Sequence, residues 1–153
     1  MGFAVRALGI AAGGKIPGEF SCAGSDTSPA LRWTDAPPAT ISFALILDDP
    51  DAPGGTWTHW LIWNIPRKAT GLPKNVAKAP EFSDGARQGR NDFQRIGYSG
   101  PCPPPGKPHR YFFHLYALHC KLDLKAGATR AELDRAMKGH VIQQAEWMAR
   151  YQS

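Results

Sequence analysis

Three apolar runs of strand length stand out in the hydrophobic pattern of the chain. Residues 42–47 are almost continuously apolar, which is typical of a central strand that is covered on both faces. Residues 59–65 form a second run that is rich in aromatic side chains. In residues 109–118 the pattern alternates, and one side of that strand would carry His109, Tyr111, Phe113 and Leu115. We expect this side to face the core.

Weaker patterns predict further elements near both ends of the chain. An N-terminal apolar stretch interrupted by Arg6 predicts an edge strand, and Leu31 and Trp33 alternate around a polar residue as in a short half-buried strand. Near the C-terminus, Thr129 and Glu132 have the spacing of a helix capping box. Apolar residues then recur every three or four positions at Leu133, Met137, Val141, Ala145 and Met148. We therefore expect a C-terminal helix whose apolar stripe packs on the core.

The composition is that of a single small globular domain. A length of 153 residues fits one domain over residues 1–153, and a hydrophobic fraction of 42% is enough for a substantial core. The chain has 16 glycines and 14 prolines, and helical periodicity only near the C-terminus. This balance favours a mainly β, loop-rich architecture over a helical bundle.

The chain carries an excess of positive charge. The formal net charge of +5 suits anionic ligands, anionic lipid surfaces or nucleic acid, without selecting one of them. Between residues 67 and 95, seven basic side chains and three acidic ones lie in a long, irregular connection. Nucleic-acid binding would need aromatic side chains among these charges for base stacking, and only Phe82 and Phe93 are present. We therefore expect a solvated basic loop and no nucleic-acid partner.

Cysteine usage and apolar runs bear on the cellular compartment. Cys22, Cys102 and Cys120 are odd in number and lack a CxxC spacing, so neither a structural zinc site nor a disulfide framework is indicated. We expect three reduced thiols. The N-terminal stretch lacks the cationic start and long apolar core of a secretory signal. No run approaches the roughly 18 apolar residues of a membrane span, and the sequence thus predicts a cytoplasmic protein without stable membrane insertion.

Two carboxylates follow the first long apolar run. Asp49 and Asp51 flank Pro50, which biases the residue before it toward extended geometry, so the two side chains would point in one direction. Adjacent carboxylates repel unless a proton, a cation or a donor lies between them. A glycine pair after this segment could turn the chain and bring back His59 as that donor. Alternatively, these residues only cap a strand end, because Asp and Pro are common in turns.

A second strand end lies just before the last apolar run. Five prolines between residues 101 and 108 make a stiff loop with few backbone donors. His109 and Tyr111 then lie where the core-facing side of the strand begins. A lone histidine at such a place is most often structural, but this end and the acidic end could converge on one pocket.

These two strand ends resemble the phosphatidylethanolamine-binding protein family, also called the Raf kinase inhibitor-like family. The resemblance rests on DPDAP followed by THW, on YSGPCPPPGKPHRYFFHLYAL, and on the segments SPALRW and GARQGRND. It covers nearly the whole chain and is to the short bacterial branch in particular. It implies a β-sandwich of two largely antiparallel sheets with peripheral helices, one of them C-terminal. It also implies a small pocket at one end of the core that receives a phosphate-type head group.

By this resemblance the pocket would contain Asp49, Asp51, Pro53, His59, Pro103, His109, Arg110 and Tyr111, with Pro104 as the alternative to Pro103. Two histidines can donate to an anion, with positive charge if one is protonated. The aspartates would accept hydrogen bonds from a histidine, from backbone groups or from an ammonium or hydroxyl of the ligand. Proline-rich walls would keep the opening rigid, so that little entropy is lost on binding.

Three functions remain open from the sequence. We favour non-enzymatic binding of small anionic, phosphate-bearing ligands such as phospholipid head groups, without a cofactor and with a regulatory role as an extension. The second is a protein-interaction regulator, an inhibitor of a kinase or protease, that uses the pocket rim. The third is a hydrolase that pairs a histidine with an aspartate, although no G-x-S-x-G elbow is present. A metal site made of the two Asp and two His residues is a variant of this last reading, and the family resemblance also allows a homodimer.

Overall fold

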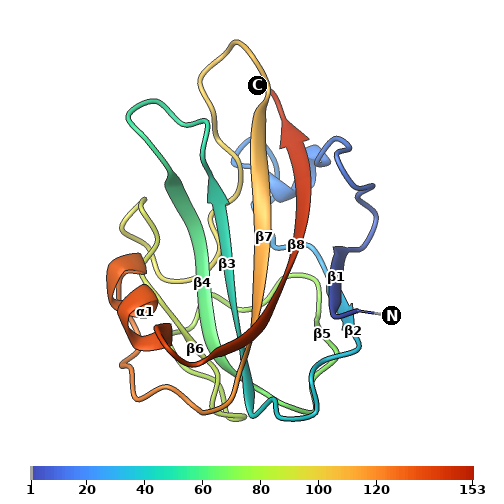
Figure 1. Cartoon of the computed structure of the whole chain (residues 1–153). Helices are drawn as coiled ribbons and strands as arrows, with labels where there is room; N and C mark the ends of the chain where they lie inside the picture. Colours follow the sequence, from blue (N-terminus) through green and yellow to red (C-terminus); the bar gives the residue numbers. More distant parts are fainter. Residues whose placement is uncertain (1) are drawn as a thin grey trace.

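Two antiparallel sheets form the framework of the molecule (Figure 1). The computed structural model describes residues 2–153. The smaller sheet has the order β1-β2-β5, with bounds β1 Ala4–Ala7, β2 Leu31–Thr34 and β5 Gly71–Leu72. The larger sheet has the order β6-β4-β3-β7-β8, with bounds β6 Arg87–Gln88, β4 Trp57–Pro66, β3 Ser42–Asp49, β7 His109–Leu118 and β8 Val141–Tyr151. A short 3-10 helix, η1 (Gly18–Phe20), and one α-helix, α1 (Arg130–Met137), complete the elements. The expected β-sandwich fold is confirmed.

Strand β3 lies at the centre of the larger sheet, as its apolar pattern predicts. All 8 of its residues are buried. Side chains from one face of the strand join the cluster between the two sheets, namely Phe43, Leu45 and Leu47. Those of the other face join a second cluster that includes residues of α1, namely Ala44 and Ile46. Because a fully buried leucine or isoleucine contributes roughly 1.5–3 kcal/mol of transfer free energy, β3 stabilises both layers.

Antiparallel pairing brings three strand ends to one edge of the larger sheet. Asp49 of β3 is paired with Trp57 of β4, and Asp48 is paired with Phe112 of β7. The end of β3 therefore lies beside the starts of β4 and β7. The alternation predicted for β7 is also present, because its odd-numbered residues after His109 are buried and the residues between them are more exposed. This arrangement directs the first core-facing side chains of β7 toward the end of β3.

The shorter strands confirm the weaker patterns and refine one of them. β1 is an edge strand of the smaller sheet, and β2 places Leu31 and Trp33 in the core. The basic connection is less irregular than expected, because it contributes β5 and β6, one to each sheet. Its carbonyl groups are tied to the framework at several points, for example by the indole of Trp33, which donates to the Ala69 carbonyl at 2.9 Å.

The C-terminal helix is much shorter than its apolar spacing predicts. The capping box is present, since Oγ1 of Thr129 accepts from the Glu132 amide and the Thr129 amide donates to the Glu132 carboxylate. However, α1 has only 8 residues. The chain turns at Gly139, where a φ of 82° favours glycine, and continues as β8. Pairing with β7 along β8 therefore outweighs the helical spacing of the apolar residues. Within residues 2–153, no helix has the length and apolarity to cross a membrane.

A disulfide contradicts the expectation of three reduced thiols. Cys22 and Cys102 are bonded, with Cα atoms 5.4 Å apart and a sequence separation of 80. The amide of Cys22 also donates to the carbonyl of Pro101 at 3.0 Å, which holds the segment after η1 against the proline-rich loop. Cys120 keeps a free thiol. Cysteine number and spacing could not reveal the pair, because the two residues meet only through the tertiary fold.

Candidate functional site

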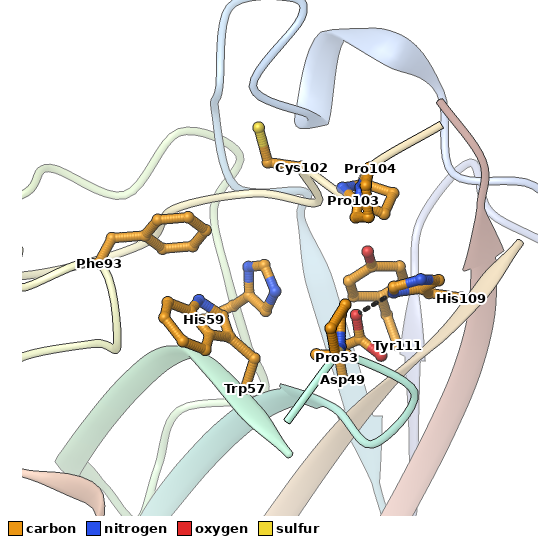
Figure 2. A pocket seen from close by; sticks show the side chains of 11 residues that line it. Asp49, Pro53, Trp57, His59, Phe93, Cys102, Pro103, Pro104, His109 and Tyr111 are labelled. Atoms are coloured by element: carbon orange, nitrogen blue, oxygen red, sulfur yellow. Dashed lines mark hydrogen bonds and ion pairs between the residues drawn. The ribbon is translucent and has the colours of Figure 1, made fainter. Parts of the chain in front are cut away.

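A pocket of about 250 Å³ lies at the sheet edge where β3 ends and β4 and β7 begin (Figure 2). Its polar and aromatic side is lined by Asp49, Trp57, His59, Phe93, His109 and Tyr111. The rest of its wall consists of Ala52, Pro53, Cys102, Pro103 and Pro104. Pockets for drug-sized ligands have volumes of roughly 300–1,000 Å³, so this one suits a head group or another small molecule.

His109 is held by a buried carboxylate at the base of the pocket. Its Nδ1 lies 2.7 Å from Oδ2 of Asp49, and the close-up shows this contact as a dashed line (Figure 2). The other carboxylate oxygen of Asp49 accepts a hydrogen bond from the Asp51 amide at 2.8 Å. Because an ionised carboxylate only accepts hydrogen bonds, the proton of this contact is on Nδ1 of His109. Nε2 of His109 is then the ring nitrogen that remains for a ligand.

His59 is fixed by the backbone instead of by a carboxylate. Its Nδ1 lies 2.6 Å from the carbonyl oxygen of Ser99, and the Ser99 amide donates to the carbonyl of His59 at 3.1 Å. A carbonyl cannot donate, so Nδ1 of His59 carries a proton and Nε2 has the lone pair of the neutral ring. Burial lowers the pKa of His59 below its ordinary value, with the neighbouring carbonyls and carboxylates opposing the effect only in part. His59 is therefore neutral at pH 7. This differs from the expectation that His59 donates to the two carboxylates.

Tyr111 lies between the two histidines with an unpaired hydroxyl. Its ring centroid is 5.3 Å from that of His59 and 6.5 Å from that of His109. The hydroxyl oxygen is buried and has no hydrogen-bond partner in residues 2–153. Burial raises the pKa of Tyr111, and so does the nearby Asp49 carboxylate through its charge and its proximity to the hydroxyl, although no hydrogen bond of normal geometry joins the two. The hydroxyl therefore keeps its proton. A buried donor left unpaired costs roughly 1–3 kcal/mol, so the Tyr111 hydroxyl would gain from any acceptor that reached it.

Trp57 supplies a second unpaired donor that the sequence analysis did not single out. Its indole nitrogen is buried and lacks a hydrogen-bond partner in the described part of the chain. Its ring contacts Phe93 edge-on, with centroids 5.4 Å apart, and Phe93 contacts His59 in the same way at 5.3 Å. A signal for Trp57 was available, because residues two apart on a strand share one face and His59 follows at that spacing. Phe93 had no such signal, because it reaches the pocket from the basic connection.

The prolines form the opposite wall of the pocket. The sequence left open whether Pro103 or Pro104 lines the pocket, and in the structure both do. Pro53 closes the side toward the β3–β4 loop. Cys102, whose side chain is labelled in Figure 2, forms the disulfide with Cys22 that connects this wall to the segment after η1. The wall is therefore tied covalently to the framework, and it loses little conformational freedom when a ligand binds.

Asp51 and Arg110 lie outside the pocket, as a pair with each other. Arg110 donates from Nε and Nη2 to the two carboxylate oxygens of Asp51, at 2.9 Å each, and its amide donates to Oδ2 of Asp51. These hydrogen bonds from Arg110 hold the pKa of Asp51 at about 2. The two aspartates therefore have different partners: Asp49 binds His109, and Asp51 binds Arg110 on the outer face of β7. The four side chains considered as metal ligands in the sequence analysis, namely Asp49, Asp51, His59 and His109, do not form one cluster.

Comparison with known proteins agrees with this architecture. Residues 8–152 match the family model of the phosphatidylethanolamine-binding proteins. The chain belongs to the phosphatidylethanolamine-binding protein (PEBP) family. It is similar to a UPF0098 protein of Methanothermobacter thermautotrophicus, with 50% identity over 138 residues that cover 90% of this chain and 91% of that protein. It is also similar to a UPF0098 protein of Chlamydia pneumoniae, with 42% identity over 148 residues and 94% of each chain covered.

Two solved structures share the PEBP fold of this chain. Escherichia coli YbcL, described as a new member of the mammalian PEBP family, superposes with a TM-score of 0.91 at 36% identity, covering 100% of this chain and 99% of that one. A PEBP homologue of Chlamydia trachomatis gives a TM-score of 0.90 at 35% identity, covering 99% of this chain and 98% of that one. The family resemblance seen in the sequence is thus confirmed over nearly the whole chain.

Proposed function

We propose that the pocket binds a small phosphate-bearing ligand, such as a phosphate monoester or a phospholipid head group, without turning it over. The observation that carries this proposal is the pair of buried, unpaired donors, the Tyr111 hydroxyl and the Trp57 indole, on residues that line one small pocket. A phosphate group offers several strong acceptor oxygens and so matches such donors. Membership of the PEBP family supports the same ligand class.

The two histidines complete the set of groups for an anion. Each has Nδ1 engaged by the protein, His59 with Ser99 and His109 with Asp49, so Nε2 is the ring nitrogen available to the ligand in both cases. A protonated Nε2 donates to a phosphate oxygen with the added strength of charge. The Asp49 carboxylate does not hold the phosphate; it orients His109 and stabilises positive charge on that ring.

The size of the pocket limits what part of a ligand it can hold. A volume of about 250 Å³ accommodates a head group, while the acyl chains of a phospholipid would remain outside. Phosphate and its monoesters are therefore sufficient ligands in this proposal. Long chains add affinity only through contacts beyond the rim.

Binding without chemistry is the simpler function for these residues. The cysteine that lines the pocket is part of a disulfide and so offers no thiolate nucleophile. The His109–Asp49 pair has the hydrogen bond of an acid-base dyad, and a hydrolase is therefore the alternative that the test must address. A role as inhibitor of a kinase or protease, and a homodimer, stay predictions from the family resemblance.

The disulfide also bears on the compartment predicted from the sequence. Disulfides persist in oxidising compartments and are rare in the cytosol. The Cys22–Cys102 bond is therefore an argument against the predicted cytoplasmic location. That location stays a prediction, which fractionation of the native host would test.

Calorimetric titration tests the proposal directly. Inorganic phosphate, phosphoethanolamine and a short-chain phosphatidylethanolamine are titrated into the wild type, His109→Ala and Arg110→Ala. The two variants alter adjacent residues on opposite faces of β7, so Arg110→Ala controls for the general loss of positive charge. We expect wild type and Arg110→Ala to bind all three ligands and His109→Ala to bind at least about tenfold more weakly. Release of phosphate from phosphoethanolamine that requires Asp49 would instead establish the hydrolase.

A further inference from the structure

A second cluster of ligating side chains lies at the end of β7 that is remote from the pocket. His119 and Cys120 directly follow β7, and His140 directly precedes β8. One ligand atom from each of the three lies within 4.8 Å of a ligand atom of both others. In residues 2–153 this is the one group of three or more His, Cys, Asp or Glu side chains that meets this distance. None of the three residues lines the pocket.

The two histidines already have the separation of ligands that share one metal ion. Nδ1 of His140 lies 3.3 Å from Nε2 of His119. Two nitrogens bound to a tetrahedral zinc ion at about 2.0–2.1 Å are themselves about 3.3 Å apart. One ring N–H that donates to the lone pair of the other ring accounts for this contact. A cation bound to both nitrogens would displace that proton. The Gly139 carbonyl oxygen also lies 3.4 Å from Nε2 of His119.

The backbone of the three residues is held in place independently of any metal. The amide of His119 donates to the carbonyl of His140 at 3.2 Å, and the amide of His140 donates to the Met137 carbonyl at 2.9 Å. The Ser42 hydroxyl donates to the carbonyl of Cys120 at 2.7 Å. These contacts fix the two residues after β7 against the turn between α1 and β8 and against the start of β3. Metal binding therefore requires adjustment of the three side chains but little ordering of the backbone.

We propose that His119, Cys120 and His140 bind a zinc-type divalent cation. A thiolate and two imidazoles are ligands that zinc prefers, whereas magnesium and calcium prefer oxygen. Cys120 has the one free thiol of the chain, and it is half-buried beside the second apolar cluster. Three protein ligands leave the fourth tetrahedral position open, and His119 is exposed, so the ion can exchange with solvent.

Some charged groups near the cluster oppose a bound cation, and others favour it. Lys121 and Lys138 are neighbours of the ligands in sequence and oppose the approach of a cation. The thiolate of Cys120 neutralises one of the two charges of the ion. The C-terminal end of α1, whose Met137 carbonyl accepts from the His140 amide, contributes negative partial charge.

The proposed metal site is separate from the phosphate pocket. β7 has 10 residues, and the cluster follows its last residue whereas the pocket contains its first. At about 3.3 Å per residue, the two sites are roughly 30 Å apart along the strand. Bound metal would link the end of β7 to the start of β8, and its presence or absence does not depend on the function of the pocket.

The test uses tag-free full-length protein with its disulfide intact, so that Cys120 is the one alkylatable thiol. The rate of iodoacetamide modification is measured with and without Zn²⁺, and Co²⁺ is titrated as a spectroscopic substitute. We expect zinc to slow alkylation of Cys120 by at least about tenfold. We expect one Co²⁺ per chain, with a thiolate-to-cobalt charge-transfer band that is absent in Cys120→Ser. His140→Ala should weaken binding by at least about 100-fold, since loss of outer-shell partners alone costs 10–100-fold.

Lys121→Ala is the matched control, because it changes an exposed neighbour that offers no ligand in this cluster. It should bind Zn²⁺ at least as tightly as the wild type. An unchanged alkylation rate in saturating Zn²⁺ would overturn the proposal. So would metal binding that survives both Cys120→Ser and His140→Ala, since the ion would then be elsewhere. Thermal unfolding of each variant verifies that it is folded. If His140→Ala does not fold, the near-isosteric Cys120→Ser still provides the test.

Discussion

Nδ1 of His109 lies 2.7 Å from Oδ2 of Asp49, although 60 positions separate the two residues in sequence. The antiparallel pairing of β3 with β7 brings the end of one strand beside the start of the other. Asp49 thereby keeps a proton on Nδ1 of His109 and leaves Nε2 as the nitrogen for the ligand. We interpret Asp49 as a positioning residue for His109.

Removing the Asp49 carboxylate should therefore weaken phosphate binding. A hydrogen bond to a charged group contributes roughly 1.5–3 kcal/mol, so Asp49→Ala should lower the affinity for phosphoethanolamine about tenfold or more. Asp51→Asn serves as the control, because Asp51 is paired with Arg110 outside the pocket. Its affinity should remain within about twofold of wild type. Calorimetry on both variants decides the point, and equal losses would contradict the division of roles between the two aspartates.

Phosphate binding should be coupled to proton uptake. Burial lowers the pKa of His59, so the free protein has a neutral ring whose Nε2 lone pair would repel a phosphate oxygen. A proton must therefore enter with the ligand, on His59 or on the phosphate. For each proton taken up, affinity should rise by up to about tenfold per pH unit as the pH falls from 8 toward 6.5.

Calorimetry in two buffers of different ionisation enthalpy measures this coupling. The observed enthalpies should differ by the number of protons taken up, and His59→Gln should reduce that number. Identical enthalpies in the two buffers would show that His59 binds the ligand without a change of protonation.

The disulfide should affect both stability and binding. It closes a loop with a sequence separation of 80, for which the chain-entropy model predicts about 4.5 kcal/mol of stabilisation. The Cys22→Ser, Cys102→Ser double variant should lose about this amount in urea unfolding and bind phosphoethanolamine more weakly, because Pro103 and Pro104 lose their covalent support. Reductant should reproduce the loss in wild type and leave the double variant unchanged. Unaltered affinity would show that the wall does not need the bond.

Asp48 links the larger sheet to α1 by a buried ionic network. Its oxygens lie 3.0 Å from Nε2 of His114 and 3.0 Å from Nη1 of Arg130. Burial alone would raise the pKa of Asp48, but hydrogen bonds and charge from His114 and Arg130 outweigh burial and lower it below 3.8. The stabilisation is therefore present above pH 3.8 and is lost as the pH falls through the lowered pKa.

Asp48→Asn tests the network at pH 7. It should destabilise the protein by about 2 kcal/mol in urea unfolding, because Arg130 loses a buried charged partner. Asp134→Asn removes the exposed partner of the same Arg130 and should cost less than about 0.5 kcal/mol. The difference should shrink as the pH falls below 3.8 through the lowered pKa of Asp48, and a difference that does not change with pH would exclude ionisation of Asp48 as its source.

Patterns confined to one strand predict this fold well. The continuous run of β3 and the alternation of β7 follow from which faces are buried, and both are present in the structure. The same alternation places His109 and Tyr111 in the lining of the pocket. The opposite face of β7 carries Arg110, which explains why a residue inside the family motif lies outside the pocket.

Features that depend on tertiary contacts could not be predicted from the sequence. The spacing of Val141, Ala145 and Met148 fits a helix, but β7 supplies hydrogen bonds to this segment that an isolated pattern cannot reveal. Cys22 and Cys102 likewise meet through two loops that are distant in the chain. The sequence offered the carboxylates of Asp49 and Asp51 as hydrogen-bond partners of His59, whereas the structure pairs His59 with the Ser99 carbonyl.

The central claim is that the pocket binds phosphate through donors that the protein leaves unpaired. Titration of ¹⁵N-labelled protein with phosphoethanolamine, followed through the five tryptophan indole N–H signals, tests it most directly. The Trp57 indole should shift strongly, while those of Trp33 and Trp60, which donate to Ala69 and Gln88 within the protein, should stay in place. A saturable shift confined to Trp57 among these three is the predicted result. An unmoved Trp57 signal at millimolar ligand would contradict the account.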